Sequence, residues 1–168
     1  MDKNRLDAAT KQLDRVLGFF ARVEAKASFI FAADTTMLAL VALNLRYEDF
    51  SHWQIAVPAV VAVIAIGASV VFVYRCSFPS LSGGNDSLVY FTEIAKRREG
   101  DYVEQFVKMD EKTLTRDVLG QVWRNSEILK LKFSAIKLSF VLTALSLIPF
   151  FLFLVAATVF HPQLPSIK

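Results

Sequence analysis

Three long apolar stretches divide this chain and constrain what it can fold into. They cover residues 27–45, 55–74 and 138–160. Each approaches the ~20 apolar residues that a helix needs to cross a hydrocarbon core about 30 Å thick. The hydrophobic share of the whole chain, 54%, is also above the ~45–50% usual in soluble domains. A soluble protein with three buried helices is the alternative, but core helices of this length usually keep a polar face. The sequence therefore predicts three transmembrane helices.

The positive charges lie on one side of these stretches. Of the 19 Lys and Arg residues, all but Arg46 and Lys168 precede the first stretch, lie between the second and third, or flank them. The positive-inside rule then predicts a cytoplasmic N-terminus and an external C-terminus. Three crossings that start inside must end outside, so the number of spans agrees with the charges. The first 26 residues are polar and charged, so we expect an uncleaved anchor rather than a secretory signal peptide.

The predicted fold class is an all-α membrane protein, with three transmembrane helices and a small helical cytoplasmic cap. The expected organisation is a cytoplasmic amphipathic helix (1–26) continuing into span one (27–45), an external hairpin loop (46–54), span two (55–74), a cytoplasmic helical segment (75–137), span three (138–160) and an external tail (161–168). The 75–137 segment is small for an independent core, so we expect it to pack against the N-terminal helix.

The cytoplasmic segments carry their own helix signals. Apolar or small residues recur every three or four positions before span one, as in a coiled-coil seam: Leu6, Ala9, Leu13, Val16, Phe20, Val23 and Ala27. This stripe needs a partner helix and is a candidate surface for assembly of several copies. Between spans two and three, we expect a helix over 88–98, a second from a capping box at Asp101 and Glu104, and a third beginning near Thr113 and continuing into the membrane.

Catalytic chemistry is not favoured by this sequence. Its two histidines, His52 and His161, are far apart in the external loop and tail, so neither a zinc site nor a Ser-His-Asp arrangement is predicted. The turn at 83–85 lacks the spacing and the Lys-Ser/Thr of a phosphate-binding loop. The excess of positive charge, +3, is small and lies beside the membrane, where lipid head groups can pair with it. We therefore predict no enzyme, metal, cofactor or nucleic-acid polymer partner.

Asp34 is an exception to the apolar pattern, because it lies inside span one. A carboxylate in a span costs about 2.5–3.5 kcal/mol by insertion scales unless it is paired or hydrated. We expect compensation from a membrane polar seam made of Asp34, Thr35, Lys137 and Lys26. Such a seam would lock the resting bundle or line a pore. The alternative is a protonated or interfacial Asp with no special role.

A polar cluster before span three is the second exception. Its cations can neutralise a phosphate, its amides can read a base edge, and nearby aromatic rings can stack. The candidate ligand-binding residues are Gln121, Arg124, Asn125, Lys130, Lys132, Tyr90 and Phe91. Trp123 is a further ring for stacking. The same residue types also suit a juxtamembrane helix that faces anionic lipid.

Several short segments carry a family resemblance. They read EAKASFIFAADT at 24–35, SFP at 77–79, LVYF at 88–91, DY at 101–102, LTRDVLGQVWRNS at 114–126 and KLKF at 130–133. In these segments the chain resembles the transmembrane effectors of the Pycsar anti-phage systems. The resemblance spans most of the chain.

The resemblance implies a multi-pass effector of the bacterial inner membrane, encoded beside a pyrimidine cyclase. In that family, the cyclase makes cyclic UMP or cyclic CMP upon phage infection, and the effector impairs the membrane so that the cell dies before phage mature. We then expect three partners: membrane lipid, the cyclic nucleotide and further copies of the chain in a homo-oligomer. The alternatives are a constitutive membrane scaffold or accessory subunit whose cap docks a protein, and a small transporter or channel, although no internal repeat supports the latter.

Overall fold

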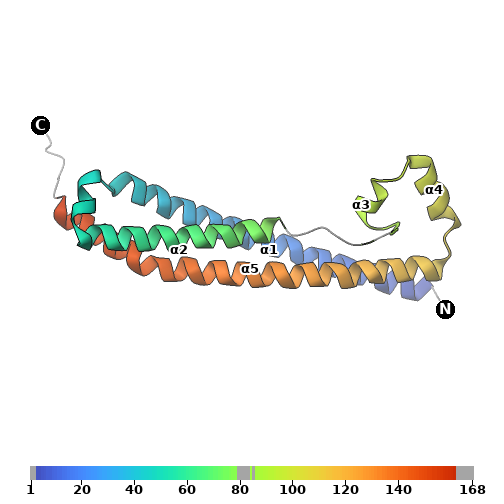
Figure 1. Ribbon diagram of the computed structural model, residues 1–168. Coiled ribbons are helices and arrows are strands. Elements are labelled where there is room, and N and C mark those ends of the chain that lie inside the picture. The colour runs from blue at the N-terminus through green and yellow to red at the C-terminus, as the bar shows by residue number, and fades with distance from the viewer. Residues whose placement is uncertain (1–2, 79–83, 85, 162–168) are drawn as a thin grey trace, which may run out of the picture. The chain divides into compact units, whose positions relative to one another are not determined.

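The computed structural model describes residues 3–78, 84 and 86–161, and all regular structure within them is helical (Figure 1). The elements are α1 (Lys3–Asn44), a 3-10 helix η1 (Tyr47–Ser51), α2 (Trp53–Ser77), α3 (Phe91–Ile94), α4 (Glu99–Lys108) and α5 (Glu111–Phe160). Three of them, α1, α2 and α5, are long and apolar enough to cross a membrane. These helices contain the three predicted spans, and the predicted all-α class with three helices of membrane-spanning length is confirmed.

The chain forms two compact units. Unit 1 comprises Met1–Glu24 and Pro79–Phe133, and unit 2 comprises Ala25–Phe78 and Ser134–Lys168. The first part of the N-terminal helix and most of the segment between spans two and three therefore belong to one unit. Both α1 and α5 contribute residues to each unit without an interruption of the helix.

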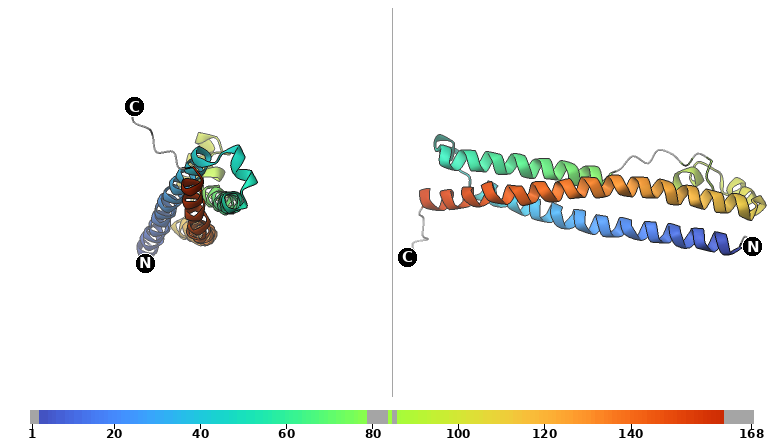
Figure 2. Two further views of the ribbon diagram at one scale, coloured as in Figure 1. Left: turned by 90° about the vertical axis from the view of Figure 1, so that its left-hand side faces the viewer. Right: turned by 90° about the horizontal axis from the view of Figure 1, so that it is seen from below.

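Unit 2 is a bundle of three helices. The second part of α1, the whole of α2 and the second part of α5 lie side by side in both views (Figure 2). The buried residues of α2 recur at steps of four and three, the spacing that keeps one face toward partner helices: Ile55, Ala59, Ala62, Ile66, Ser69, Val73 and Cys76. An apolar core joins the three helices through Met37, Val41, Ile55, Ala59, Ala62, Ile66, Phe150, Phe153 and Ala157. The outward faces carry exposed apolar side chains such as Phe29, Leu43, Ile64 and Ile148, which suit contact with lipid tails.

In unit 1, the stripe of α1 is covered by the chain itself. Ala9, Val16 and Val23 are buried. The ammonium of Lys132 on α5 lies 3.2 Å from Glu24 Oε1 and 5.6 Å from the centre of the Phe20 ring. These contacts make α5 the partner helix that the stripe needs. The buried residues of the stripe are therefore not a free surface, while assembly of several copies through the half-buried Leu6, Leu13 and Phe20 stays a prediction.

The predicted helix over 88–98 is wrong in length, because α3 has four residues, Phe91–Ile94. Side chains take the backbone donors that would begin a longer helix. The Leu88 N–H donates to Asp117 Oδ2 at 2.8 Å, and the N–H groups of Val89 and Tyr90 donate to Ser87 Oγ at 3.1 and 2.9 Å. Such side-chain bonds compete with helix formation.

The two helices that follow begin earlier than predicted. Helix α4 starts at Glu99 after an Arg98 cap with no side-chain hydrogen bond, so the expected capping box at Asp101 is wrong. Helix α5 starts at Glu111. Asp110 precedes it and accepts the Thr113 N–H at 3.0 Å, as an N-cap residue does. The hydrogen bonds from Thr113 hold the pKa of the Asp110 carboxyl below its ordinary value.

A polar contact links the α1–α2 connection to the end of α5. Asp49 in η1 is fully buried and accepts the Arg46 backbone N–H at 2.7 Å, and its other oxygen lies 2.5 Å from His161 Nε2. The Nδ1 atom of His161 lies 3.4 Å from Arg46 Nη1. We call Arg46, Asp49 and His161 the loop clasp.

Candidate functional site

A buried polar cluster lies among the three helices of unit 2. The Asp34 side chain is fully buried, with 0% exposure. Its two oxygens accept hydrogen bonds from Ser69 Oγ on α2, at 2.7 Å, and from Thr143 Oγ1 on α5, at 2.8 Å. Ser139 Oγ lies 2.7 Å from Ser69 Oγ. Hydroxyl groups from two other helices therefore solvate this carboxylate.

The residues predicted to accompany Asp34 lie elsewhere. The Thr35 hydroxyl donates within its own helix, to the carbonyl of Phe31 at 2.9 Å. Lys26 and Lys137 are exposed, and among the described residues neither forms an ion pair with Asp34. The sequence pattern did not single out Ser139 and Thr143. A usable signal existed, because both share the inward spacing of three and four positions with the buried residues of α5.

Unit 1 contains a pocket between the loop at 84–87 and the first part of α5. Its volume is about 440 Å³, within the range of about 300–1,000 Å³ typical of small-molecule sites. The lining residues are Gly84, Asp86, Ser87, Met109, Thr113, Arg116, Asp117, Gly120, Gln121, Trp123 and Arg124. We call this cavity the loop pocket.

Hydrogen bonds fix the loop that forms one wall of this pocket. Gln121 Nε2 donates to Ser87 Oγ at 3.2 Å. Arg97 donates to the carbonyl oxygens of Asp86 and Ser87, each at 2.9 Å. At Gly84, φ is +78°, a left-handed conformation that favours glycine. The wall is therefore built from contacts to α5 and to the segment after α3.

The loop pocket brings together some of the predicted ligand residues and leaves others apart. Gln121 and Arg124 line it, as does the indole of Trp123, which is 63% exposed. Asn125 is half-buried and lies outside the lining, and Lys130 and Phe91 are exposed outside it. Tyr90 is buried against Gly84. Lys132 is only 3% exposed and is held by Glu24.

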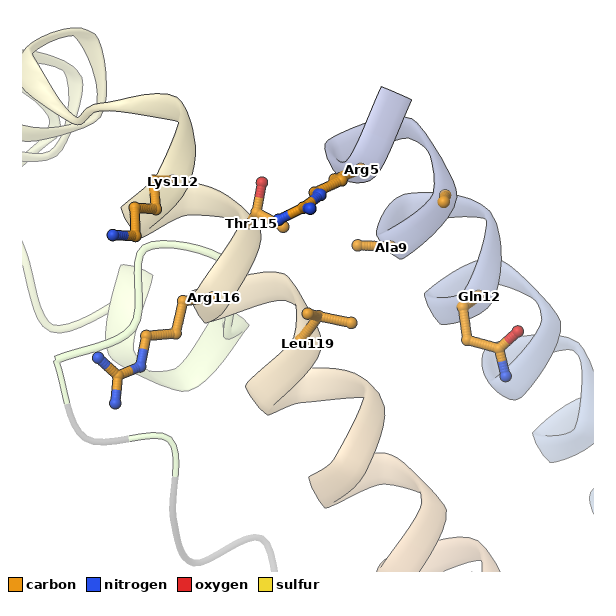
Figure 3. Close-up of a pocket in the computed structure, with 8 residues that line it drawn as sticks. Arg5, Ala9, Gln12, Lys112, Thr115, Arg116 and Leu119 are labelled. Atoms are coloured by element: carbon orange, nitrogen blue, oxygen red, sulfur yellow. The ribbon is translucent and has the colours of Figure 1, made fainter. Parts of the chain in front are cut away.

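Arg116 is a lining residue that the sequence pattern did not single out. It lies eight residues before Arg124 on α5, and both residues line the loop pocket. It also lines a second cavity of about 460 Å³, between the start of α1 and the start of α5. Figure 3 shows the Arg5 side chain directed from α1 toward Thr115, and Arg116 directed away from α1.

The two cavities differ in charge. Among the described residues, the second cavity is lined by Arg5, Lys112 and Arg116 and by no carboxylate. The loop pocket has two arginines and two aspartates. One of these, Asp117, already accepts the Leu88 N–H. The loop pocket therefore suits a ligand that carries both an anionic group and N–H donors.

Three membrane-crossing helices, a polar cluster among them and a polar pocket in a separate unit define a small helical membrane protein with room for a small ligand. The Pycsar effector protein domain matches residues 8–161. The chain therefore belongs to this family of transmembrane effectors in anti-phage defence, and the resemblance drawn from its motifs is confirmed. No curated protein and no solved structure matches the chain.

Proposed function

We propose that this protein is an effector of the bacterial inner membrane that cyclic UMP or cyclic CMP activates by binding to the loop pocket. The observation that carries the proposal is the lining of that pocket, where two arginines and an exposed tryptophan surround about 440 Å³ in a member of the Pycsar effector family. The protein itself performs no catalysis in this proposal. It converts a nucleotide signal into loss of membrane integrity.

Each part of a cyclic pyrimidine nucleotide has a counterpart in the lining. The phosphodiester anion pairs with the guanidinium groups of Arg116 and Arg124, which bind phosphate through charge-assisted hydrogen bonds. The pyrimidine ring stacks on Trp123. The base edge carries N–H donors in both uracil and cytosine, and these are directed to Asp117 or to the amide of Gln121. Arg124 and Gln121 retain their predicted roles, and Arg116 joins them.

Binding acts on the membrane through helices that the two units share. Because α1 and α5 run through both units as continuous helices, a shift of α5 at the pocket is passed along the helix axis into the bundle. The nucleotide favours the state for which it has the higher affinity, and so it changes the populations of resting and active molecules. The active state is a homo-oligomer that disrupts the bilayer.

Binding is tested on the detergent-purified full chain with cyclic UMP, cyclic CMP, cyclic AMP and cyclic GMP. A ligand that binds the folded protein raises its apparent Tm. We expect one pyrimidine nucleotide to do so selectively. Arg116→Ala and Arg124→Ala each remove a charged hydrogen bond, so each lowers the affinity by about 10- to 100-fold.

The matched control is Lys130→Ala, which removes a charge from the same helix outside the pocket lining. It leaves the affinity unchanged. If none of the four nucleotides binds, the proposal fails, and the scaffold whose cap docks a protein becomes the better reading.

The membrane step is tested with the same variants in liposomes that contain a trapped dye. Adding the pyrimidine nucleotide releases the dye from liposomes with the wild-type chain and with Lys130→Ala, but not from those with Arg124→Ala. Nucleotide binding without dye release would separate the binding site from the proposed effect on the membrane.

A further inference from the structure

The polar cluster of unit 2 contains an unusual concentration of oxygen atoms. Six oxygens from Asp34, Ser69, Ser139 and Thr143 lie within a few ångströms of one another in the middle of the bundle. Ser69 Oγ lies 2.7 Å from Asp34 Oδ2, 2.7 Å from Ser139 Oγ and 2.9 Å from Thr143 Oγ1. Thr143 Oγ1 lies 2.8 Å from Asp34 Oδ1. The carbonyl oxygen of Ser139 lies 3.2 Å from both Ser69 Oγ and Thr143 Oγ1.

The three hydroxyl protons are fewer than these six contacts. The hydroxyl groups of Ser69, Ser139 and Thr143 supply one proton each, whereas the carboxylate and the carbonyl supply none. At least three of the contacts therefore share a proton or lack one. A positive charge among the oxygens would stabilise the contacts that lack a proton.

The charge of the cluster leads to the same conclusion. Asp34 and Ser139 are fully buried, as is Ser69. No ion pair to Asp34 occurs in the part of the chain that the structure describes. A buried carboxylate without a counter-charge is costly inside a membrane protein.

The oxygens define what kind of ion fits. Hard cations prefer oxygen ligands, and transporters coordinate Na⁺ near the middle of the membrane with backbone carbonyl oxygens. Calcium sites use six to eight oxygens with several carboxylates, and no cluster of three or more His, Cys, Asp or Glu side chains occurs among the described residues. We propose that Asp34, Ser69, Ser139 and Thr143 form a binding site for one monovalent metal cation, which ties the three helices of unit 2 together.

The experiment uses the full chain in detergent, with NaCl, LiCl, KCl or choline chloride at equal ionic strength and without nucleotide. A metal cation that binds the folded state raises Tm in a saturable manner, whereas choline is too large to enter. We expect such a rise for at least one alkali cation, and binding of one ²²Na⁺ per chain. Asp34→Asn keeps the size of the side chain but removes its charge, so it abolishes both signals.

Thr143→Val provides a second variant of matched shape, should Asp34→Asn fail to fold, and it lowers the cation affinity by removing one ligand. The control is Ser146→Ala. Ser146 is fully buried as well, but its hydroxyl donates to the Thr143 carbonyl at 2.7 Å and is not among the six oxygens. This control keeps the cation response.

Equal Tm values in all four salts, or a cation response that persists in Asp34→Asn, would overturn the inference. Because no nucleotide is present, this result is independent of the proposed function. Loss of nucleotide binding in Arg124→Ala would leave the cation response unchanged.

Discussion

Gly84 is a residue whose identity the backbone dictates. Its φ of +78° is unfavourable for other residues, and a Cβ atom there would lie 2.6 Å from Cδ1 of the Tyr90 ring. A Gly84→Ala substitution therefore combines backbone strain with a clash, and we expect it to destabilise unit 1 by about 1–3 kcal/mol. Thermal unfolding of the purified chain measures the loss, and nucleotide affinity should fall with it because Gly84 lines the loop pocket.

Gly100 provides the comparison for Gly84. It lies in α4, and nothing comes within 4 Å of a Cβ atom built on it. Gly100→Ala should be neutral or stabilising by about 0.5–1 kcal/mol, because alanine loses less conformational freedom in a helix. Equal losses of stability in the two variants would contradict a special role for the backbone at Gly84.

Because of the loop clasp, the stability of the folded chain is expected to depend on pH. Burial alone would raise the pKa of the Asp49 carboxyl, but the Arg46 backbone N–H and the imidazole of His161 hold it below its ordinary value. An acid whose pKa is lower in the folded state contributes stability above its unfolded pKa, and this contribution is lost as the pH falls through the folded pKa.

At neutral pH, the Tm of the Asp49→Asn variant should therefore be lower than that of the wild type. Between about pH 5 and pH 2, the Tm of the variant should fall less than that of the wild type. The measurement is a series of melting curves across that range. Glu48→Gln serves as the control, because Glu48 is an exposed neighbour. A wild-type acid profile in Asp49→Asn would show that the clasp adds no pH dependence.

Asp34 shows where prediction from residues ends. Its cost in a span was evident from the sequence, and so was the need for compensation. The partners of Asp34 were not evident from the sequence. The predicted partners, Lys26 and Lys137, can remain at the membrane edge, where their charges are better solvated. Ser69 and Thr143 are ordinary residues until three helices bring them within 3 Å of one carboxylate. Their role is a property of the packing.

At the level of elements, regular spacing made the fold predictable. Apolar length identified the spans, and the steps of three and four in α1 identified a helix that needs a partner. Helix α3 was not predictable to the same degree. Its start depends on a hydrogen bond from Leu88 to Asp117, which is 29 positions away in the sequence. The local spacing of apolar residues does not predict a contact between residues so far apart.

The same spacing predicts which positions of α2 tolerate larger side chains. Ala62 is fully buried on the face of α2 that packs against the other helices, and its neighbour Val61 is 48% exposed on the outward face. Ala62→Leu adds volume where helices pack closely and should cost about 1–3 kcal/mol. Val61→Leu should leave Tm unchanged in detergent. Similar Tm values for both variants would argue against the packing of α2 through this face.

For the whole molecule, the composition of unit 1 explains why the segment between spans two and three needs help to fold. That unit combines Met1–Glu24 with Pro79–Phe133, and the Lys132–Glu24 contact joins the two parts. A segment of this size buries too little surface to be stable alone. The N-terminal helix therefore serves two purposes, because it completes the core of unit 1 and continues into the membrane.

The distribution of charge predicts the orientation of the chain in the membrane, and the proposed function requires this orientation. A nucleotide made in the cytoplasm can reach the loop pocket only if unit 1 faces the cytoplasm.

In a Cys76→Ala background, we expect Ser51→Cys to react with a membrane-impermeant maleimide in intact cells, whereas Gln105→Cys reacts only after permeabilisation. The positive-inside rule gives the physical reason, because Lys and Arg near the ends of spans resist translocation. Both positions are exposed, so burial does not prevent labelling of either. The opposite pattern would place the loop pocket outside the cell, and a nucleotide signal from the cytoplasm could not then act through it.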